Sequence, residues 1–127
     1  MVIASSAIIL ENRKLLLIER SESMRVFPLC WACPGGLVEE NESAEQAVLR
    51  EVKEETNLDF RPTKLFSTGM YQDRNLYRFL GEWSGQVRIQ KKEISKWGWF
   101  SYEDAAHLTF AFEYREVIEK LHKYGLI

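Results

Sequence analysis

The sequence predicts an α/β fold in which a mixed β-sheet carries helices on both faces. Strand patterns come first along the chain, a helical pattern follows, and further strands precede a last helix. This order is typical of layered α/β domains, because each strand and helix must bury its apolar face against another layer. The length of 127 residues suits one hydrophobic core, so we expect residues 1–127 to form a single domain.

The first part of the chain predicts a β-hairpin. Residues 2–10 and 14–20 have the composition of strands, and the polar residues 11–13 between them are typical of a turn. Residues 27–33 predict an extended aromatic segment, which runs into a turn at Pro34-Gly35-Gly36.

The second half of the chain predicts further strands. Residues 65–71 and 76–83 are expected to pair around a turn at 72–75, and short strands are expected at 86–89 and 97–100.

Two helices follow these strands in the prediction. Ser101 and Asp104 form a capping box that opens a short helix over residues 102–106. Residues 112–124 predict the last helix, which Gly125 ends. Its apolar face consists of Tyr114, Val117, Ile118 and Leu121.

The central helix has the clearest boundaries in the chain. It is expected to begin at Ser43, where Ser43 and Gln46 form a capping box that satisfies the first free backbone N–H groups. Asn57 stands where the chain leaves the helix. After glycine, asparagine most readily takes the left-handed conformation that a C-terminal cap requires.

Carboxylates interrupt the apolar face of this helix. That face consists of Ala44, Ala47, Val48 and Val52. Glu51 and Glu55 fall within the same stripe, and Glu54 lies at its edge. Three carboxylates within one turn repel each other and resist dehydration unless cations neutralise them. Oxygen ligands at this spacing suit Mg²⁺ or Mn²⁺, whereas the alternative interpretation is an acidic helix end exposed to solvent.

The segment 36–58 resembles the Nudix box. That pattern is Gly, five residues, Glu, seven residues, then Arg-Glu-aliphatic-any-Glu-Glu-any-Gly-aliphatic. The matching positions are Gly36, Glu42, Arg50, Glu51, Val52, Glu54, Glu55 and Leu58. Asn57 replaces the usual glycine, a departure that a left-handed cap tolerates. The resemblance implies an α/β/α sandwich, in agreement with the order of the elements.

The resemblance also implies an activity. Nudix enzymes hydrolyse a nucleoside diphosphate linked to another group, releasing a nucleoside monophosphate and the phosphorylated group. The implied metal ligands are Glu51, Glu54, Glu55 and the backbone carbonyl of Gly35, with Mg²⁺ as the cation and Mn²⁺ as a substitute. Either one of these carboxylates or a downstream carboxylate removes a proton from the attacking water.

Other residues receive roles around this expected site. Arg50 is interpreted as the orienting partner of Glu42, with an exposed helix arginine as the alternative. Arg20 resembles a basic residue that many family members aim at substrate phosphates, and Gly35 and Gly36 are expected to lie against the substrate. Three downstream acids compete as a further metal ligand: Glu93, Glu103 and Glu113. Glu93 is preferred, because its segment resembles one that often precedes the Trp-bearing strand in the family.

Cysteine and aromatic residues admit simpler interpretations. Cys30 and Cys33 form a CxxC motif without a second pair, so we interpret them as two thiols with no shared chemistry. Five aromatic residues either stack a base or pack in the core, and the sequence does not decide between these uses. They are Phe27, Trp31, Tyr71, Tyr77 and Phe110.

Apolar runs and net charge limit the binding partners that we expect. No apolar run approaches the roughly 18 residues of a membrane span, so we expect a cytoplasmic protein without a membrane partner. The net charge of −2 gives no long basic stripe, so extended nucleic acid is not an expected ligand. A homodimer is compatible with the sequence.

Three hypotheses about function stay open. The favoured one is a Mg²⁺-dependent pyrophosphohydrolase of small nucleotides such as nucleoside triphosphates or ADP-ribose. The others are a hydrolase acting on the 5′ end of RNA and a non-catalytic nucleotide sensor. Retention of Glu51, Glu54 and Glu55 argues against the sensor.

Overall fold

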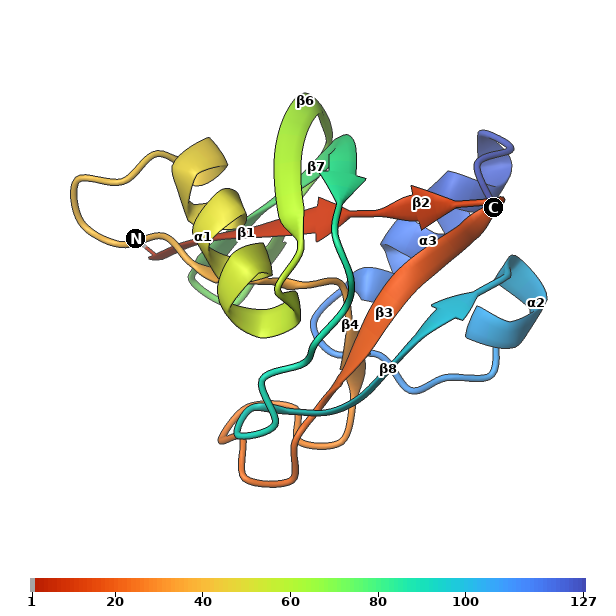
Figure 1. The fold of residues 1–127 in the computed structure, drawn as a ribbon, viewed down its shortest axis with the longest axis horizontal. Coiled ribbons are helices and arrows are strands. Elements are labelled where there is room, and N and C mark those ends of the chain that lie inside the picture. The colour runs from red at the N-terminus through yellow and green to blue at the C-terminus, as the bar shows by residue number, and fades with distance from the viewer. Residues whose placement is uncertain (1) are drawn as a thin grey trace.

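Two four-stranded β-sheets and three helices make up the computed structural model, which describes residues 2–127 (Figure 1). The strands are β1 (Val2–Ile8), β2 (Leu10–Glu11), β3 (Lys14–Arg20), β4 (Trp31–Ala32), β5 (Gly35–Leu37), β6 (Asp59–Tyr71), β7 (Arg74–Ser84) and β8 (Ile94–Phe100). The helices are α1 (Ala44–Thr56), α2 (Tyr102–Ala105) and α3 (Tyr114–Lys123).

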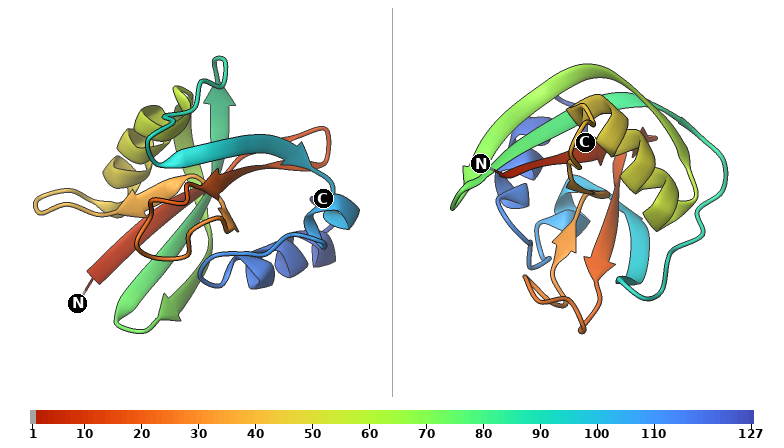
Figure 2. Two further views of the ribbon diagram at one scale, coloured as in Figure 1. Left: turned by 90° about the horizontal axis from the view of Figure 1, so that it is seen from below. Right: turned by 90° about the vertical axis from the view of Figure 1, so that its left-hand side faces the viewer.

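The first sheet is mixed and has the order β5-β1-β7-β6. Strand β1 runs parallel to β7 and antiparallel to β5, and β6 and β7 form a long antiparallel hairpin. Helices α1 and α3 lie on opposite sides of the strands (Figure 2). The predicted α/β/α sandwich is therefore confirmed, although the strands form two sheets and not one.

The second sheet is built around β3. Strand β8 pairs with one edge of β3. On the opposite edge of β3, β2 pairs with the first residues of β3 and β4 pairs with residues near its C-terminal end. The predicted hairpin of residues 2–10 with 14–20 is correct only at its closed end. At that end, the carbonyl of Ile9 accepts the N–H of Leu16 at 3.0 Å. The residues before Ile9 leave this sheet, and β1 pairs with β5 and β7 instead.

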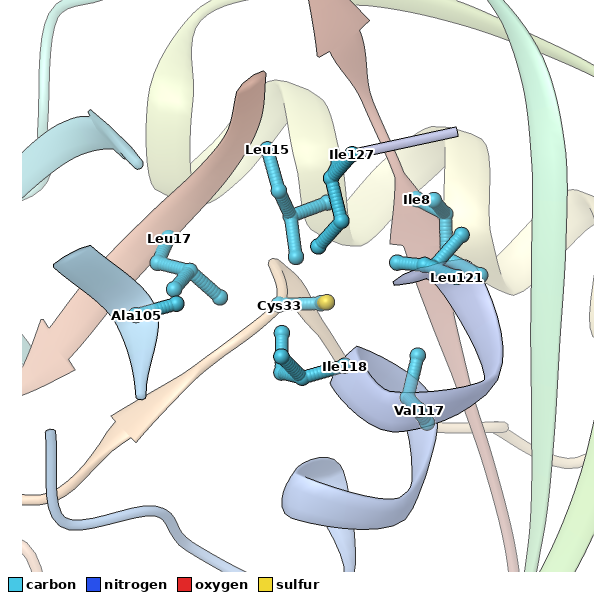
Figure 3. Packing of buried hydrophobic residues seen from close by; sticks show 9 residues of the cluster. All are labelled: Ile8, Leu15, Leu17, Cys33, Ala105, Val117, Ile118, Leu121 and Ile127. Carbon is cyan, nitrogen blue, oxygen red and sulfur yellow. The ribbon is translucent and has the colours of Figure 1, made fainter. Parts of the chain in front are cut away.

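Consecutive residues of β1 and β3 bury their side chains on opposite faces, which explains why both strands read as nearly continuous apolar runs. One cluster lies against α1 and includes Ala7, Ile9, Leu16, Val48 and Val52. The other lies against α2 and α3 (Figure 3) and includes Ile8, Leu15, Leu17, Cys33, Ile118 and Leu121. Each fully buried Leu or Ile contributes about 1.5–3 kcal/mol.

Two predicted strands are absent or shorter in the structure. Residues 86–89 form no strand, because hydrogen bonds hold this segment to the end of α1: Arg88 N–H donates to Thr56 O at 2.8 Å and Gln90 N–H to Glu55 O at 3.0 Å. The aromatic segment 27–33 is extended only over β4, since Phe27 and Leu29 have φ angles of 51° and 60°.

Other strands and helices begin or end at residues that differ from the prediction. Strands β6 and β7 are longer than predicted and meet at a turn of only two residues, Gln72 and Asp73. Helix α3 begins at Tyr114 and not at residue 112, because Phe112 has a φ of 50°, which is incompatible with a right-handed helix. No helix within residues 2–127 is both long and apolar enough to cross a membrane.

Both predicted caps of α1 are confirmed. Ser43 Oγ accepts the N–H of Gln46 at 3.0 Å, and Gln46 Oε1 accepts the N–H of Ser43 at 2.8 Å. Asn57 takes the left-handed conformation with φ 69°, and its N–H donates to Lys53 O at 3.0 Å. The helix that carries the acidic residues is therefore held at both ends by local interactions.

Asn57 provides the first test. We expect Asn57→Gly to leave the free energy of unfolding unchanged or to raise it by at most about 1 kcal/mol, because glycine adopts a positive φ without strain. Asn57→Val should lower it clearly, because a β-branched residue is strained there. Urea unfolding of both variants measures the difference. Equal stabilities would show that the left-handed cap is not maintained.

Candidate active site

A cavity of about 310 Å³ collects residues from both sheets, from α1 and from the segment that leads into α3. This volume is at the lower end of the range of small-molecule sites. Carboxylates of Glu51, Glu55 and Glu93 line it together with the guanidinium groups of Arg20 and Arg74. Acidic and basic groups therefore share one cavity, as recognition of a phosphorylated ligand with a cation requires.

Two glycines of β5 allow close packing beside this cavity, Gly35 against β1 and Gly36 against α1. A Cβ atom added to Gly35 would lie 2.2 Å from Ser5 O, and one added to Gly36 would lie 2.5 Å from Glu51 Cδ. The backbone N–H of Gly35 donates to Glu55 Oε1 at 2.8 Å. The predicted turn at Pro34-Gly35-Gly36 is wrong for the two glycines, which lie in β5 and pair with β1. From this strand they contact Glu51 and Glu55, two of the predicted metal ligands.

Glu55 lies where a charged carboxylate is disfavoured. Burial raises its pKa well above the ordinary value, and the negative charges of Glu51 and Glu93 raise it further. The hydrogen bond from Gly35 and the charge of Arg20 oppose this shift without cancelling it. Glu55 is therefore a carboxylate whose ionised form would be stabilised by a nearby cation.

Glu51 has a similar environment. Burial raises its pKa, and the hydrogen bond from Arg50 and the charge of Arg50 partly offset the effect. Glu54 differs, because its side chain is 57% exposed and lies outside the lining of the cavity. The structure thus brings Glu51 and Glu55 to the cavity and leaves Glu54 at its rim.

Arg50 forms the predicted contact with Glu42. Its Nε donates to Glu42 Oε2 at 2.8 Å and its Nη2 to Glu42 Oε1 at 2.9 Å. Hydrogen bonds from Arg50 and from the N–H of Glu39 lower the pKa of Glu42 to about 2. The two carboxylate oxygens and the two nitrogens form the bidentate geometry that suits an arginine.

The position of Arg50 relative to the acidic face corrects the helical projection. The projection places it on the face opposite Glu51 and Glu54. In the structure its long side chain folds back, and Nη1 donates to Glu51 Oε1 at 2.8 Å and to Glu54 Oε2 at 3.3 Å. Nη2 also donates to the backbone carbonyl of Leu37 at 3.1 Å. Arg50 therefore connects Glu42, two of the acids on α1 and strand β5.

Among the three downstream acids, the structure favours Glu93. It lines the cavity, whereas Glu103 lies on α2 and Glu113 precedes α3. Gln90 holds Glu93 in place, because Gln90 Nε2 donates to Glu93 Oε1 at 3.0 Å and Gln90 Oε1 accepts the N–H of Glu93 at 2.9 Å.

The donor chemistry fits a hard divalent cation. Burying the neighbouring carboxylates of Glu51 and Glu55 is unfavourable unless protons or a cation neutralise them, and oxygen donors suit Mg²⁺ or Mn²⁺. Among residues 2–127, however, no three acidic, cysteine or histidine side chains already converge on one point. Glu54 would have to turn from Arg50 toward the cavity to complete such a set.

Sequence reasoning missed the basic and aromatic wall of the cavity. Arg74, Phe112 and Tyr114 line it, together with the predicted Arg20. Burial lowers the pKa of Arg20, and Arg74 adds to the shift. No local motif marks Arg74, because only the pairing of β7 with β1 and β6 brings it to the site.

The open question about the aromatic residues is largely decided in favour of packing. Phe27 and Tyr71 pack against Phe112, with ring centroids 4.9 and 5.5 Å from the Phe112 centroid. Trp31 and Phe110 pack against the cluster under α3. Tyr77 packs against the other cluster and also lines the cavity, so it stays available for a ligand.

The cysteines form no bond with each other. Both thiols are free, and Cys33 is buried. Burial raises the pKa of Cys33 to about 12, although the positive charge of Arg78 opposes the shift. A thiol with so high a pKa is not a nucleophile at neutral pH.

Arg78 is a buried arginine that the sequence did not single out. It is only 3% exposed, and its Nε and Nη2 atoms find no hydrogen-bond partner within residues 2–127. Its Cζ atom lies 5.8 Å from the centroid of the Tyr114 ring.

Comparison with known proteins identifies the family. The model of the NUDIX domain matches residues 2–121, so the chain belongs to the Nudix hydrolase family. An 8-oxo-dGTP diphosphatase of Buchnera aphidicola is 32% identical over 123 residues, which cover 91% of this chain and 89% of that protein. The crystal structure of a MutT NUDIX hydrolase from Burkholderia pseudomallei matches with a TM-score of 0.85 at 25% identity, covering 94% of this chain and 97% of that chain.

A second relative is much longer than this chain. An m7GpppN-mRNA hydrolase of Xenopus laevis is 30% identical over 121 residues, which cover 79% of this chain but only 41% of that protein. The chain therefore spans less than half the length of this relative.

The raised pKa values predict how stability depends on pH in chelator. A carboxyl group whose pKa is raised by folding contributes stability that is full below its unfolded pKa and is lost as the pH rises through its folded pKa. Glu51 and Glu55 should therefore make the protein less stable as the pH rises above about 4.5. Glu42 acts in the opposite sense, but only between pH 4.5 and about 2.

Glu55→Gln tests this expectation. The amide oxygen can still accept the N–H of Gly35, so the variant should be more stable than the parent at pH 8 and should lose less stability between pH 5 and pH 8. Thermal unfolding in excess chelator, with Glu45→Gln as the control on the same helix, measures both effects. If the melting temperatures of the parent and of Glu55→Gln fell equally with rising pH, Glu55 would not be the group with the raised pKa.

Proposed function

We propose that the chain is a Mg²⁺-dependent pyrophosphohydrolase, acting as a single domain, that cleaves a phosphoanhydride bond of small nucleoside diphosphate derivatives. The products are a nucleoside monophosphate and a phosphorylated leaving group. The observation that carries the proposal is the joint position of Glu51, Glu55 and the two glycines of β5 in a cavity that also contains Arg20. This constellation supplies oxygen donors for a cation and a positive charge for phosphate.

In this proposal the chain holds the cation through Glu51, Glu54, Glu55 and the carbonyl oxygen of Gly35, with Glu93 as a further ligand. When bound, Mg²⁺ neutralises the charge that develops on the phosphate oxygens and orients the substrate. Mn²⁺ has the same ligand preference and would substitute.

Other residues position the metal ligands, bind the substrate and accept a proton from the attacking water. Arg50 holds Glu51 in position through Nη1, and its bidentate contact with Glu42 fixes the guanidinium group. Glu54 exchanges its contact with Arg50 for the cation. Arg20 binds a substrate phosphate. A carboxylate of the cavity accepts the proton of the attacking water. Both Glu55, whose pKa is raised by burial, and Glu93 line the cavity and are candidates for this step.

One second candidate has a specific observation in its favour. The similarity to the Xenopus mRNA hydrolase supports action on the 5′ end of RNA, in which the same bond type is cleaved. The net charge of −2 opposes the binding of extended RNA but not of a short 5′ end.

A substrate screen distinguishes these candidates. Nucleoside triphosphates including 8-oxo-dGTP, ADP-ribose, NADH, dinucleoside polyphosphates, nucleotide sugars and a short capped RNA would be tested with Mg²⁺, and the products measured. Turnover of the small nucleotides without turnover of capped RNA supports the proposal. The cytoplasmic location and a homodimer stay predictions, which cell fractionation and sedimentation would test.

Divalent cations should be required for turnover. Chelation should abolish activity, and Mg²⁺ or Mn²⁺ should restore it, because Glu51 and Glu55 alone place negative charge against the phosphates. Glu54→Gln and Glu55→Gln should each lower kcat by roughly 10²- to 10⁴-fold, while Glu45→Gln on the same helix keeps full activity. Full activity in excess chelator would disprove the metal site.

Turnover at fixed, subsaturating Mg²⁺ should rise from acid to alkaline pH, with an optimum above about 7.5. Protons compete with the cation for Glu51 and Glu55, whose pKa values are raised, so the competition extends to higher pH than for ordinary carboxylates. Increasing Mg²⁺ should shift the acid limb to lower pH. A limb that does not move across a hundredfold range of Mg²⁺ would show that the titrating group is not a ligand.

A further inference from the structure

Two arginines approach the ring of Phe112 at the basic wall of the cavity. The Cζ atom of Arg74 lies 5.0 Å from the ring centroid, and that of Arg20 lies 5.4 Å from it. Phe112 is fixed in turn by Phe27 and Tyr71, whose rings pack against it. The ring therefore serves as a rigid support for both guanidinium groups.

This arrangement brings two positive charges together without a paired acid. Neither guanidinium forms an ion pair with a carboxylate of residues 2–127, in contrast to Arg50, which contacts Glu39, Glu42, Glu51 and Glu54. Burial lowers the pKa of Arg20 and repulsion from Arg74 lowers it further, whereas the charges of Glu55 and Glu93 raise it. Contacts with an aromatic ring offset only part of this repulsion, so the free protein holds a pair of cations that an anion would stabilise.

The side chain of Arg20 is also oriented in advance. Its Nε donates to the backbone carbonyl of Val26 at 2.9 Å, which fixes the plane of the guanidinium group. Arg74 begins β7 and is held by backbone pairing to Val2 on β1 and to Tyr71 on β6. Strand pairing thus positions Arg74 directly after the turn at Gln72 and Asp73, and the carbonyl of Val26, in the segment between β3 and β4, orients Arg20. These contacts reduce the ordering that binding an anion would require.

We propose that Arg74 and Arg20, supported by Phe112, form an anion subsite that selects substrates with a charged phosphate beyond the one held at the acidic wall. The acidic wall at Glu51 and Glu55 and the basic wall at Arg74 lie in the same cavity. A nucleoside triphosphate or a longer polyphosphate can place one phosphate at the cation held by the acidic wall and another phosphate at the two arginines. A nucleoside diphosphate sugar places a neutral group at one of them and leaves the guanidinium groups unmatched.

The subsite rests on the proposed function for the identity of its substrate, but it can be tested without turnover. The probe is inorganic tripolyphosphate, measured by calorimetry in excess chelator at low ionic strength, with orthophosphate for comparison. The parent protein should bind tripolyphosphate more tightly than orthophosphate. Arg74→Gln should weaken tripolyphosphate binding by about 10- to 100-fold, the usual loss for a charged hydrogen bond.

Matched variants separate the subsite from general electrostatics. Arg61→Gln removes the same charge from an exposed arginine on β6, outside the cavity, and should leave binding within about twofold of the parent. Arg74→Lys keeps the charge but loses the planar donor pair, so its affinity should lie between those of the parent and Arg74→Gln. In the absence of anions, Arg74→Gln should melt at the same temperature as the parent or higher, because a like-charge repulsion is removed.

A second measurement concerns specificity. With a triphosphate substrate, Arg74→Gln should raise KM and leave kcat nearly unchanged. The loss in kcat/KM should be larger for the triphosphate than for ADP-ribose, whereas Arg61→Gln should keep the constants of the parent with both substrates. The inference is overturned if the parent does not bind tripolyphosphate, if Arg74→Gln and Arg61→Gln lose the same affinity, or if Arg74→Gln melts at a clearly lower temperature. An inactive protein that still shows the Arg74-dependent binding would refute the proposed hydrolysis and retain the subsite.

Discussion

The close approach of α1 to Gly35 and Gly36 of β5 is the contact on which the site depends. Gly36 allows the carboxylate of Glu51 to lie where a Cβ atom would otherwise be, and the N–H of Gly35 donates to Glu55. On its other side Gly35 lies against β1, where a Cβ atom would meet Ser5 O. The two glycines of β5 therefore set how closely this strand approaches β1 and α1. A side chain at Gly36 would displace the carboxylate of Glu51, and one at Gly35 would force β5 away from β1.

Charge is distributed unevenly around this contact. Arg50 neutralises part of the acidic group through contacts with Glu42, Glu51 and Glu54, which reduces the repulsion that would otherwise oppose folding. It does not reach Glu55, which is buried beside the cavity and has the strongly raised pKa. The protein thus stabilises the outer acids by itself and leaves the inner one to protons or a cation. Such unbalanced charge is common at functional sites, where a ligand completes the electrostatics.

The local features of the site could be predicted from the sequence because they depend on short-range chemistry. The capping box of Ser43 and Gln46, the left-handed Asn57 and the contact between Glu42 and Arg50 all involve residues within one helix or its flanks. The contact of Arg50 with Glu51 and Glu54 was missed for a different reason. A helical projection treats each side chain as a point, whereas an arginine is long enough to fold back over the neighbouring turn.

By itself, the sequence determined the α/β/α class and the position and caps of the acidic helix, because periodicity and capping are local properties. The predicted turn at Gly35-Gly36 is instead strand β5, because pairing with β1 extends the chain there. The tertiary structure alone decided that the strands form two sheets, that Glu93 and not Glu103 or Glu113 joins the cavity, and that Arg74 and Phe112 form its basic wall. These residues come from segments far apart in the chain. Their meeting depends on strand pairing and on the positive φ of Phe112, which no local pattern encodes.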